Sequence, residues 1–216
     1  MHLLLLRHGQ TDDNARGVLQ GQSPTELNEL GHRQARSLAD RLTTFVPRVE
    51  ALVTSDLTRA VQTAAAIERA LGLTARRVEA WRERGFGPYE GRAVGEAETW
   101  RLATGNWDLP GAEPTSVFRA RVLGAFDEVV AGHASMTCVG VVTHGAVIRT
   151  VLTLIGEGVI ASATGQPAPE SVPIANCSIL WLQRDGTGAR RVWRVACVND
   201  VAHLETLAAS APLAGQ

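Results

Sequence analysis

Two histidines stand in the same local setting, each directly after an apolar run and each followed by glycine. His8 follows Leu3–Leu6 and Arg7, and His144 follows a run of small and branched apolar residues that ends at Thr143. Apolar runs of this length, bounded by polar turns, are typical of strands buried on both faces in parallel sheets. Because parallel strands present their functional loops at their carboxyl ends, we expect both imidazoles at one edge of one sheet.

Two arginines are expected at the same edge. Arg7 precedes His8, and Arg59 lies in the first turn of a helix predicted over residues 57–71, off its apolar stripe. A cation there is unfavourable with the helix dipole, so something negative beside Arg59 is expected. Guanidinium groups match phosphate oxygens, and the N–H groups of a helix N-terminus attract anions. These groups predict a phosphoryl site, in which a histidine can attack phosphorus and form a phosphoenzyme.

The same residues have other interpretations. A metal site would pair the histidines with carboxylates, but the chain has no H-x-H, H-E-x-x-H or Cys/His cluster, and Arg7 would repel a cation. Neither G-x-x-x-x-G-K-[ST] nor a G-x-G-x-x-G that opens a helix is present. We therefore expect no metal and no cofactor. From the pattern alone, a structural pair of histidines that cap buried strands stays open.

The elements that must position these groups alternate between strand and helix. This alternation predicts an α/β fold with three layers, α/β/α, around a mostly parallel central sheet. A turn signal at residues 184–188 between two β-rich segments predicts a hairpin, and so an antiparallel edge strand. The expected helices cover residues 29–45, 57–71, 94–102, 115–130 and 146–154, and the expected strands cover residues 3–6, 51–53, 74–78, 137–143, 177–182 and 191–198.

Several segments lack such periodicity. Residues 12–26 have loop chemistry, and a loop this long inside a compact domain is usually functional. Residues 81–114 carry tryptophans, glycines and prolines, and we expect an irregular excursion or small cap over the site. Residues 156–175 are expected to form a surface loop, and the tail from residue 206 to be frayed.

Composition narrows the partners and the compartment. The net charge of −1 leaves no basic surface for nucleic acid. The chain shows no secretion signal and no apolar run long enough to span a membrane, which predicts a cytoplasmic protein. Cys138, Cys177 and Cys197 are odd in number and lie in apolar stretches, as expected of reduced, buried thiols.

Short motifs follow one another along the chain: Arg7-His8-Gly9-Gln10-Thr11 with Asn14, then Gln20-Gly21, Leu27–Gly31 with Gln34-Ala35, Ser55–Ala64, Thr143-His144-Gly145 and the ending Asn199–Leu204. Through these motifs the sequence resembles, over nearly its whole length, the histidine phosphatase superfamily, with the phosphoglycerate mutase-like fold. Gln10 replaces the family's common Glu, and Ser23 replaces its frequent Asp. The resemblance implies one histidine phosphatase domain of residues 1–216.

The resemblance also implies roles for individual residues. His8 would be the nucleophile that becomes phosphorylated, and Glu83 the general acid that protonates the leaving group. Beside a bound dianion a carboxylic acid holds its proton more tightly, because like charges repel. The implied phosphate and substrate site consists of Arg7, Asn14, Gln20, Gly21, Arg59, His144 and Gly145.

The segment after Glu83 favours the phosphatase branch. Residues 84–91 resemble that branch's Phe-Gly-x-Trp-Glu-Gly block, with Tyr89 in place of Trp, rather than the Arg-His-Tyr-Gly of mutases. We therefore predict a metal-independent phosphatase that hydrolyses a small phosphomonoester through a phosphohistidine. The alternatives are a cofactor-dependent phosphoglycerate mutase and an inactive phosphate-binding pseudo-enzyme.

The identity of the ester stays open from the sequence. Glucosyl-3-phosphoglycerate, α-ribazole phosphate, phosphoserine and a broad range of esters all remain candidates, as does a homodimer of the chain. A group of aromatic residues is expected either to line an apolar or sugar-binding wall or to belong to the core: Trp81, Phe86, Tyr89, Trp100 and Trp107.

Overall fold

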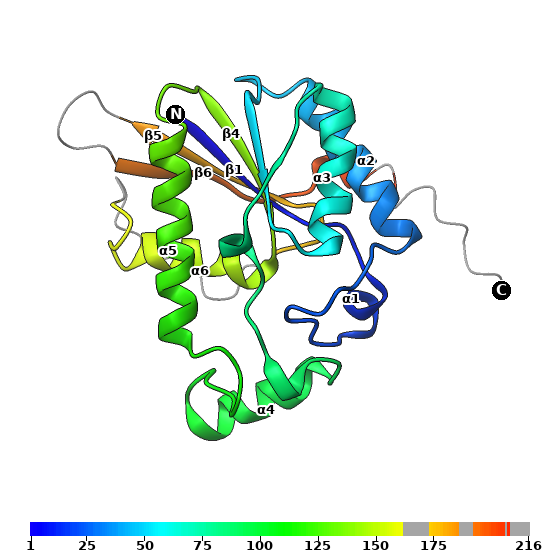
Figure 1. Ribbon diagram of the computed structural model, residues 1–216, viewed down its shortest axis with the longest axis vertical. Coiled ribbons are helices and arrows are strands. Elements are labelled where there is room, and N and C mark those ends of the chain that lie inside the picture. The colour runs from blue at the N-terminus through cyan, green and yellow to red at the C-terminus, as the bar shows by residue number, and fades with distance from the viewer. Residues whose placement is uncertain (162–172, 186–191, 206, 208–216) are drawn as a thin grey trace.

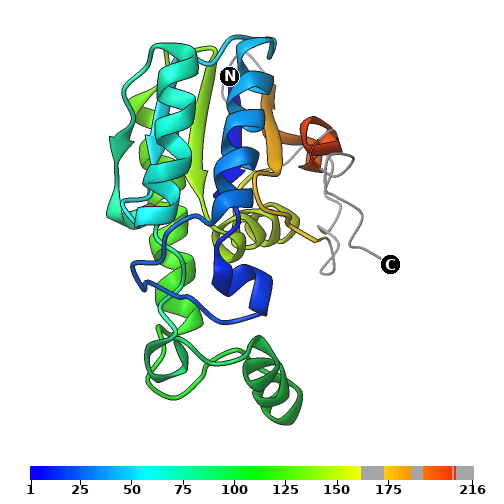
Figure 2. The same cartoon turned by 90° about the vertical axis from the view of Figure 1, so that its right-hand side faces the viewer.

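A computed structural model describes residues 1–161, 173–185, 192–205 and 207. Its centre is a six-stranded sheet of order β3-β2-β4-β1-β5-β6, drawn in Figures 1 and 2. The first four strands in this order pair in parallel, whereas β5 pairs antiparallel with both β1 and β6. The mostly parallel sheet with an antiparallel edge is thus confirmed, although residues 186–188 of the predicted hairpin turn lie outside the described residues. The strands are β1 (His2–Arg7), β2 (Ala51–Thr54), β3 (Arg76–Arg77), β4 (Cys138–Thr143), β5 (Ile179–Asp185) and β6 (Val192–Asp200).

Helices cover both faces of the sheet and complete three layers. Helices α2 and α3 pack on one face and α5 and α6 on the other (Figures 1 and 2). The helices are α1 (Asp12–Arg16), α2 (Glu29–Thr43), α3 (Thr58–Leu71), α4 (Val94–Thr104), α5 (Thr115–Gly132) and α6 (Gly145–Gly156), with short 3-10 helices η1 (Glu79–Trp81), η2 (Gly87–Tyr89) and η3 (Ala202–Leu204).

The leucine run of β1 joins the two helical layers. Leu3 and Leu5 belong to the core under α5 and α6, and Leu4 and Leu6 to the core under α2 and α3. All four side chains are fully buried, because successive side chains of a strand point to opposite faces of the sheet and helices cover both faces. Burial of each leucine stabilises the fold by about 1.5–3 kcal/mol, so the strand that ends at His8 is firmly held.

Two local expectations were wrong. The segment predicted as a loop over residues 12–26 begins with the short helix α1, because Thr11 Oγ1 accepts the N–H of Asn14 while Asn14 Oδ1 accepts the N–H of Thr11. Strand β3 is a two-residue, exposed edge strand and not the five-residue strand predicted.

The expected excursion holds α4, which stands away from the sheet in both views (Figures 1 and 2). Phe86, Tyr89 and Trp100 pack against a small separate cluster there, and Trp107 is 41% exposed. Trp81, by contrast, is 1% exposed and belongs to the main core, so it forms no binding wall.

Other sequence expectations have mixed outcomes. Cys138 and Cys177 are buried free thiols, whereas Cys197 on strand β6 is only partly buried. In the described part of the chain no helix has the length and apolar character that a bilayer crossing requires. Residues 162–172 of the predicted surface loop lie outside the described residues, as does the tail at residues 206 and 208–216.

Gly31 allows the backbone of α2 to touch the corner after β1. A Cβ at this position would lie 2.0 Å from the carbonyl oxygen of Gln10. We expect Gly31→Ala to lower the free energy of unfolding, measured by urea denaturation, by about 1–3 kcal/mol through overpacking. The matched control is Gly124→Ala on α5, where a Cβ meets nothing within 4 Å and helix propensity should raise stability by about 0.5–1 kcal/mol. Equal effects of the two substitutions would contradict the close approach.

Candidate active site

The site begins where two neighbouring parallel strands end. Arg7 pairs with Thr143 in the last register position of β1 and β4, and the His8 N–H donates to the Thr143 carbonyl at 3.0 Å. The residues that follow, His8 and His144, are both buried, and their ring centroids lie 5.1 Å apart. The structure therefore brings together the two histidines that the sequence placed at one sheet edge.

Hydrogen bonds define the tautomer of His8. Its Nδ1 lies 2.7 Å from the Gly9 carbonyl oxygen, which can only accept, so Nδ1 carries the proton. Its Nε2 accepts a hydrogen bond from Nε of Arg59 at 3.3 Å. Burial, followed by the charges of Arg59 and Arg7, holds the pKa of His8 well below its ordinary value. The imidazole is therefore neutral and keeps its Nε2 lone pair, as a nucleophile requires.

Arg59 in α3 is buried and ties the loop after α1 to the histidines. Its Nη2 donates to the Gly21 carbonyl at 2.7 Å, and its Nη1 donates to the Ser23 carbonyl at 3.0 Å and to Thr25 Oγ1 at 3.1 Å. The Thr25 hydroxyl in turn donates to Oε1 of Gln20 at 2.6 Å. These partners are neutral oxygens, and the negative charges that act on Arg59 are those of Glu83, Glu90 and Asp13. Burial lowers the pKa of Arg59 to about 10, so the group stays a cation at neutral pH.

His144 is the N-cap residue of α6 and is held by Ser55. Ser55 Oγ accepts the Leu57 N–H at 3.3 Å and lies 2.8 Å from Nε2 of His144, to which its own hydroxyl proton can be donated. The other ring nitrogen, Nδ1, is buried and has no partner among the described residues. Burial, then the charge of Arg59, lowers the pKa of His144 well below its ordinary value. His144 is thus a neutral imidazole beside His8.

Arg7 lies against the first turn of α6. A Cβ on Gly145 would lie 3.5 Å from Arg7 Nε, an ordinary contact distance, which places the guanidinium beside the N-terminus of the helix. Nη1 donates to the Ile174 carbonyl, whereas Nε is buried without a partner among the described residues. An oxyanion at this position would find donors from Arg7 and from the helix amides together.

Glu83 reaches the same helix from the segment between η1 and η2. Its Oε2 accepts the Ala146 N–H at 3.1 Å, and its Oε1 accepts the Arg84 N–H at 2.9 Å. Ala146 is the second residue of α6, next to Gly145. The carboxyl group therefore lies at the helix N-terminus that His144 caps.

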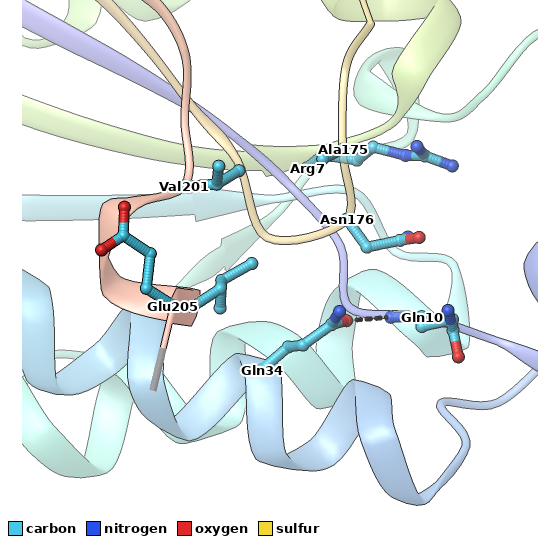
Figure 3. Close-up of a pocket in the computed structure, with 8 residues that line it drawn as sticks. Arg7, Gln10, Gln34, Ala175, Asn176, Val201 and Glu205 are labelled. Atoms are coloured by element: carbon cyan, nitrogen blue, oxygen red, sulfur yellow. Dashed lines mark hydrogen bonds between the residues drawn. The ribbon is translucent and has the colours of Figure 1, made fainter. Parts of the chain in front are cut away.

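Asn14 is oriented by Asn176, a residue that sequence analysis missed. Asn176 Nδ2 donates at 3.0 Å both to Asn14 Oδ1 and to the His8 carbonyl. Arg7 and Asn176 both line a hollow of about 450 Å³ beside the corner. Figure 3 shows their side chains extending to the side away from Glu205. Because the oxygen of Asn14 is occupied, its amide N–H groups are available for a ligand.

Glu90 is a second residue that the sequence did not single out. Its Oε1 accepts the N–H groups of Gln22 and Phe86, both at 3.0 Å, and its Oε2 accepts the Ser23 hydroxyl at 2.8 Å. The carboxylate thereby joins the loop that carries Gly21 to the segment that carries Glu83. A hydroxyl at position 23 suits Glu90, since a second carboxylate there would face like charge.

The described residues contain no candidate metal-binding site. Within residues 1–161, 173–185, 192–205 and 207, no three His, Cys, Asp or Glu side chains gather in the manner of a metal site. The site itself is a ring of donors around the neutral imidazole of His8. Other side chains that hold it, to which the sequence analysis gave no role, are Gln22, Thr25 and Thr63.

Comparisons with known proteins agree with this arrangement. The profile of the histidine phosphatase superfamily (branch 1) matches residues 3–200. A probable phosphatase of Schizosaccharomyces pombe is 32% identical over 95% of this chain and 96% of its own length. A probable phosphoglycerate mutase GpmB of Yersinia pestis is 30% identical over 95% of both chains.

Solved structures extend the likeness to three dimensions. The mycobacterial glucosyl-3-phosphoglycerate phosphatase in complex with VO3 superposes with a TM-score of 0.75 at 29% identity, covering 92% of this chain and 98% of its own. The sheet order, the paired histidine corners and the sequence matches all agree. The chain belongs to branch 1 of the histidine phosphatase superfamily and is a phosphoric monoester hydrolase of the phosphohistidine type.

Proposed function

We propose that His8 is the nucleophile of this phosphatase and that it hydrolyses a small phosphorylated metabolite without a metal ion. The observation that carries the proposal is the fixed tautomer of His8, with Nδ1 bound to Gly9 and the Nε2 lone pair facing Arg59. In the first step Nε2 attacks phosphorus and the ester oxygen leaves. In the second step water attacks the phosphohistidine and releases inorganic phosphate.

The donors around His8 are proposed to hold the transferring group. Arg7 and Arg59 supply positive charge, and the Nδ1 proton of His144 and the amide of Asn14 supply directed hydrogen bonds. The unpartnered Arg7 Nε and His144 Nδ1 support this role. Preorganised donors stabilise charge that develops on the three equatorial oxygens, without the cost of reorienting water.

Glu83 is proposed to move the protons. Its place at the N-terminus of α6 supports protonation of the leaving oxygen in the first step. The resulting carboxylate would then take a proton from the attacking water. Gln20 and Gly21 are proposed to border the same space, since both are tied to Arg59 through hydrogen bonds.

We propose a phosphorylated sugar or sugar acid as the substrate class. The glucosyl-3-phosphoglycerate phosphatase relative and the aromatic side chains of Phe86, Tyr89 and Trp100 in the excursion support it. The mutase relative makes phosphoryl transfer between phosphoglycerates a second activity to be tested. The unpaired thiols of Cys138 and Cys177 support a cytoplasmic location.

The proposal predicts metal-independent turnover. We expect release of inorganic phosphate from phosphosugars, phosphoglycerates, phosphoserine, nucleotides and an aryl phosphate to be unchanged by EDTA, with the highest kcat/KM for a sugar or sugar-acid ester. Transfer of label from one phosphoglycerate to another, without net phosphate release, would instead favour the mutase. Loss of all activity in EDTA with recovery on adding a divalent cation would contradict the mechanism.

A further inference from the structure

Arg121 on α5 uses every hydrogen-bond donor of its guanidinium on the segment around Glu83. Nε and Nη2 donate to the two carboxylate oxygens of Glu113, at 2.9 and 2.8 Å. Nη1 donates to the carbonyls of Ala80 and Arg82 at 3.0 and 2.8 Å, and Nη2 also donates to the Glu83 carbonyl at 3.2 Å. A guanidinium has five N–H groups, and all five are satisfied here.

The segment that carries Glu83 needs such support. Between η1 and η2 it has no regular helix or strand of its own. The Thr143 hydroxyl binds the Trp81 carbonyl at 2.9 Å, between the two carbonyls that Arg121 Nη1 binds. Four successive carbonyl groups, from residue 80 to residue 83, are therefore fixed by side chains from other elements.

Glu113 completes the arrangement from the other end of the excursion. Its Oε2 accepts the Gly85 N–H at 3.1 Å, its main-chain N–H donates to the Gly85 carbonyl at 2.8 Å, and its own carbonyl accepts Nε of Arg84 at 2.9 Å. Burial opposes ionisation of Glu113, but the bonds from Arg121 and Gly85 outweigh it and lower its pKa. The carboxylate therefore stays ionised and neutralises Arg121.

We propose that Arg121 and Glu113 are positioning residues that aim the carboxyl group of Glu83 at the leaving oxygen. Arg121 binds the carbonyl of Glu83, and Glu113 binds the N–H of Gly85, so the main chain is held on both sides of the Glu83 side chain. That side chain accepts the Ala146 N–H on α6. Neither touches the phosphate site through a hydrogen bond that the structure records. This inference rests on the proposed role of Glu83 as the acid.

The chemistry of the pair explains why these two residue types are used. Lysine has three donors at a point charge and cannot reach three carbonyls and a carboxylate together. Glu113 binds both Nε and Nη2 of Arg121 and so fixes the plane of the guanidinium that the carbonyls require. The ion pair therefore sets the geometry of the main chain around Glu83.

The test compares substrates that differ in their need for an acid. Glycerol phosphate has a poor leaving group that requires protonation, whereas 2,4-dinitrophenyl phosphate leaves unaided. We expect Arg121→Lys to lower kcat/KM for glycerol phosphate by about 10- to 100-fold and that for the dinitrophenyl ester by less than about 3-fold. The inhibition constant of inorganic phosphate should not change, because the phosphate pocket is untouched.

Matched variants make the test specific. Arg119→Met removes another arginine of α5, one that pairs with Glu157 on the surface, and should leave both substrates unaffected. Glu83→Gln should show the same selective loss for glycerol phosphate, and the double variant Glu83→Gln/Arg121→Lys should lose no more than Glu83→Gln alone. If Arg121→Lys does not fold, Glu113→Gln carries the same comparison.

The outcomes separate the two hypotheses. A selective loss in both single variants, without additivity, supports the positioning role. If Glu83→Gln is selective but Arg121→Lys slows both esters equally or neither, the positioning role is overturned and Glu83 remains the acid. If Glu83→Gln itself shows no selectivity, the assignment of Glu83 fails, and the inference about Arg121 fails with it.

Discussion

Replacing His8 with alanine should abolish phosphatase activity and the phosphoenzyme together. The hydrogen bond from Nδ1 of His8 to the Gly9 carbonyl keeps Nε2 unprotonated, so that Nε2 can attack phosphorus. Loss of a nucleophile costs on the order of 10⁴–10⁶-fold in kcat. Rapid quenching with labelled substrate should trap an acid-labile phosphohistidine in the natural enzyme and none in His8→Ala.

The matched control is His32→Ala, which removes an exposed histidine of α2. It should keep full activity and full labelling. His144 stands 5.1 Å from His8 between ring centroids and is the obvious competitor for the label. If His8→Ala still forms an acid-labile phosphoenzyme, the nucleophile has been assigned to the wrong histidine.

Replacing Arg59 with methionine should give the second largest effect. The change removes the donor to His8 and leaves the carbonyls of Gly21 and Ser23 without their partner. Loss of one such preorganised donor costs about 10²–10³-fold, and loss of the charge adds to it. We expect kcat/KM for any phosphomonoester to fall by at least this factor, and inorganic phosphate to become a weaker inhibitor.

The pH profile provides a second measurement on the same variant. After burial, the charge of Arg59 is the largest cause that lowers the pKa of His8. Without this charge, the pKa of His8 rises toward its ordinary value, so the imidazole becomes protonated at higher pH. The acid limb of the pH profile of kcat/KM therefore shifts to higher pH. Arg59→Lys keeps the charge and should leave the limb in place. Arg76→Met, at an exposed ion pair with Glu128, is the neutral control.

The residues that sequence analysis found share one property: each lies directly after a strand or in a short local motif. His8 and His144 follow buried strands, and the strand ends of a parallel sheet meet at one edge. The order of helices and strands was predictable for the same reason, since periodicity is a local signal. The cap of α1 was also readable in Thr11 and Asn14, but the polar composition of the segment obscured it.

The residues that sequence analysis missed act through long-range contacts. Asn176 contacts Asn14 from 162 positions away along the chain. Arg121 binds the carbonyls of Ala80, Arg82 and Glu83 from about 40 positions away. Backbone carbonyls are common to every residue, so no sequence pattern marks them as partners. Trp81 was placed with the excursion by its neighbours, although its own size favoured the core that it occupies.

The hydrogen bond between Gly85 and Glu113 gives the excursion a narrow neck. The two ends of residues 86–112 are joined there at 2.8 Å, while Leu19, Ala97 and Leu109 form a cluster apart from the main core. The excursion is also held by the loop after α1: the Leu19 N–H donates to the Arg92 carbonyl, the Val94 N–H donates to the Gly17 carbonyl, and Glu90 accepts hydrogen bonds from Gln22 and Ser23. Because the entropy of closing a loop grows only slowly with its length, the part of the excursion beyond these contacts can change length at small cost. Substrate preference can diverge through that part, in evolution or in the laboratory, while the nucleophile and its surroundings stay unchanged.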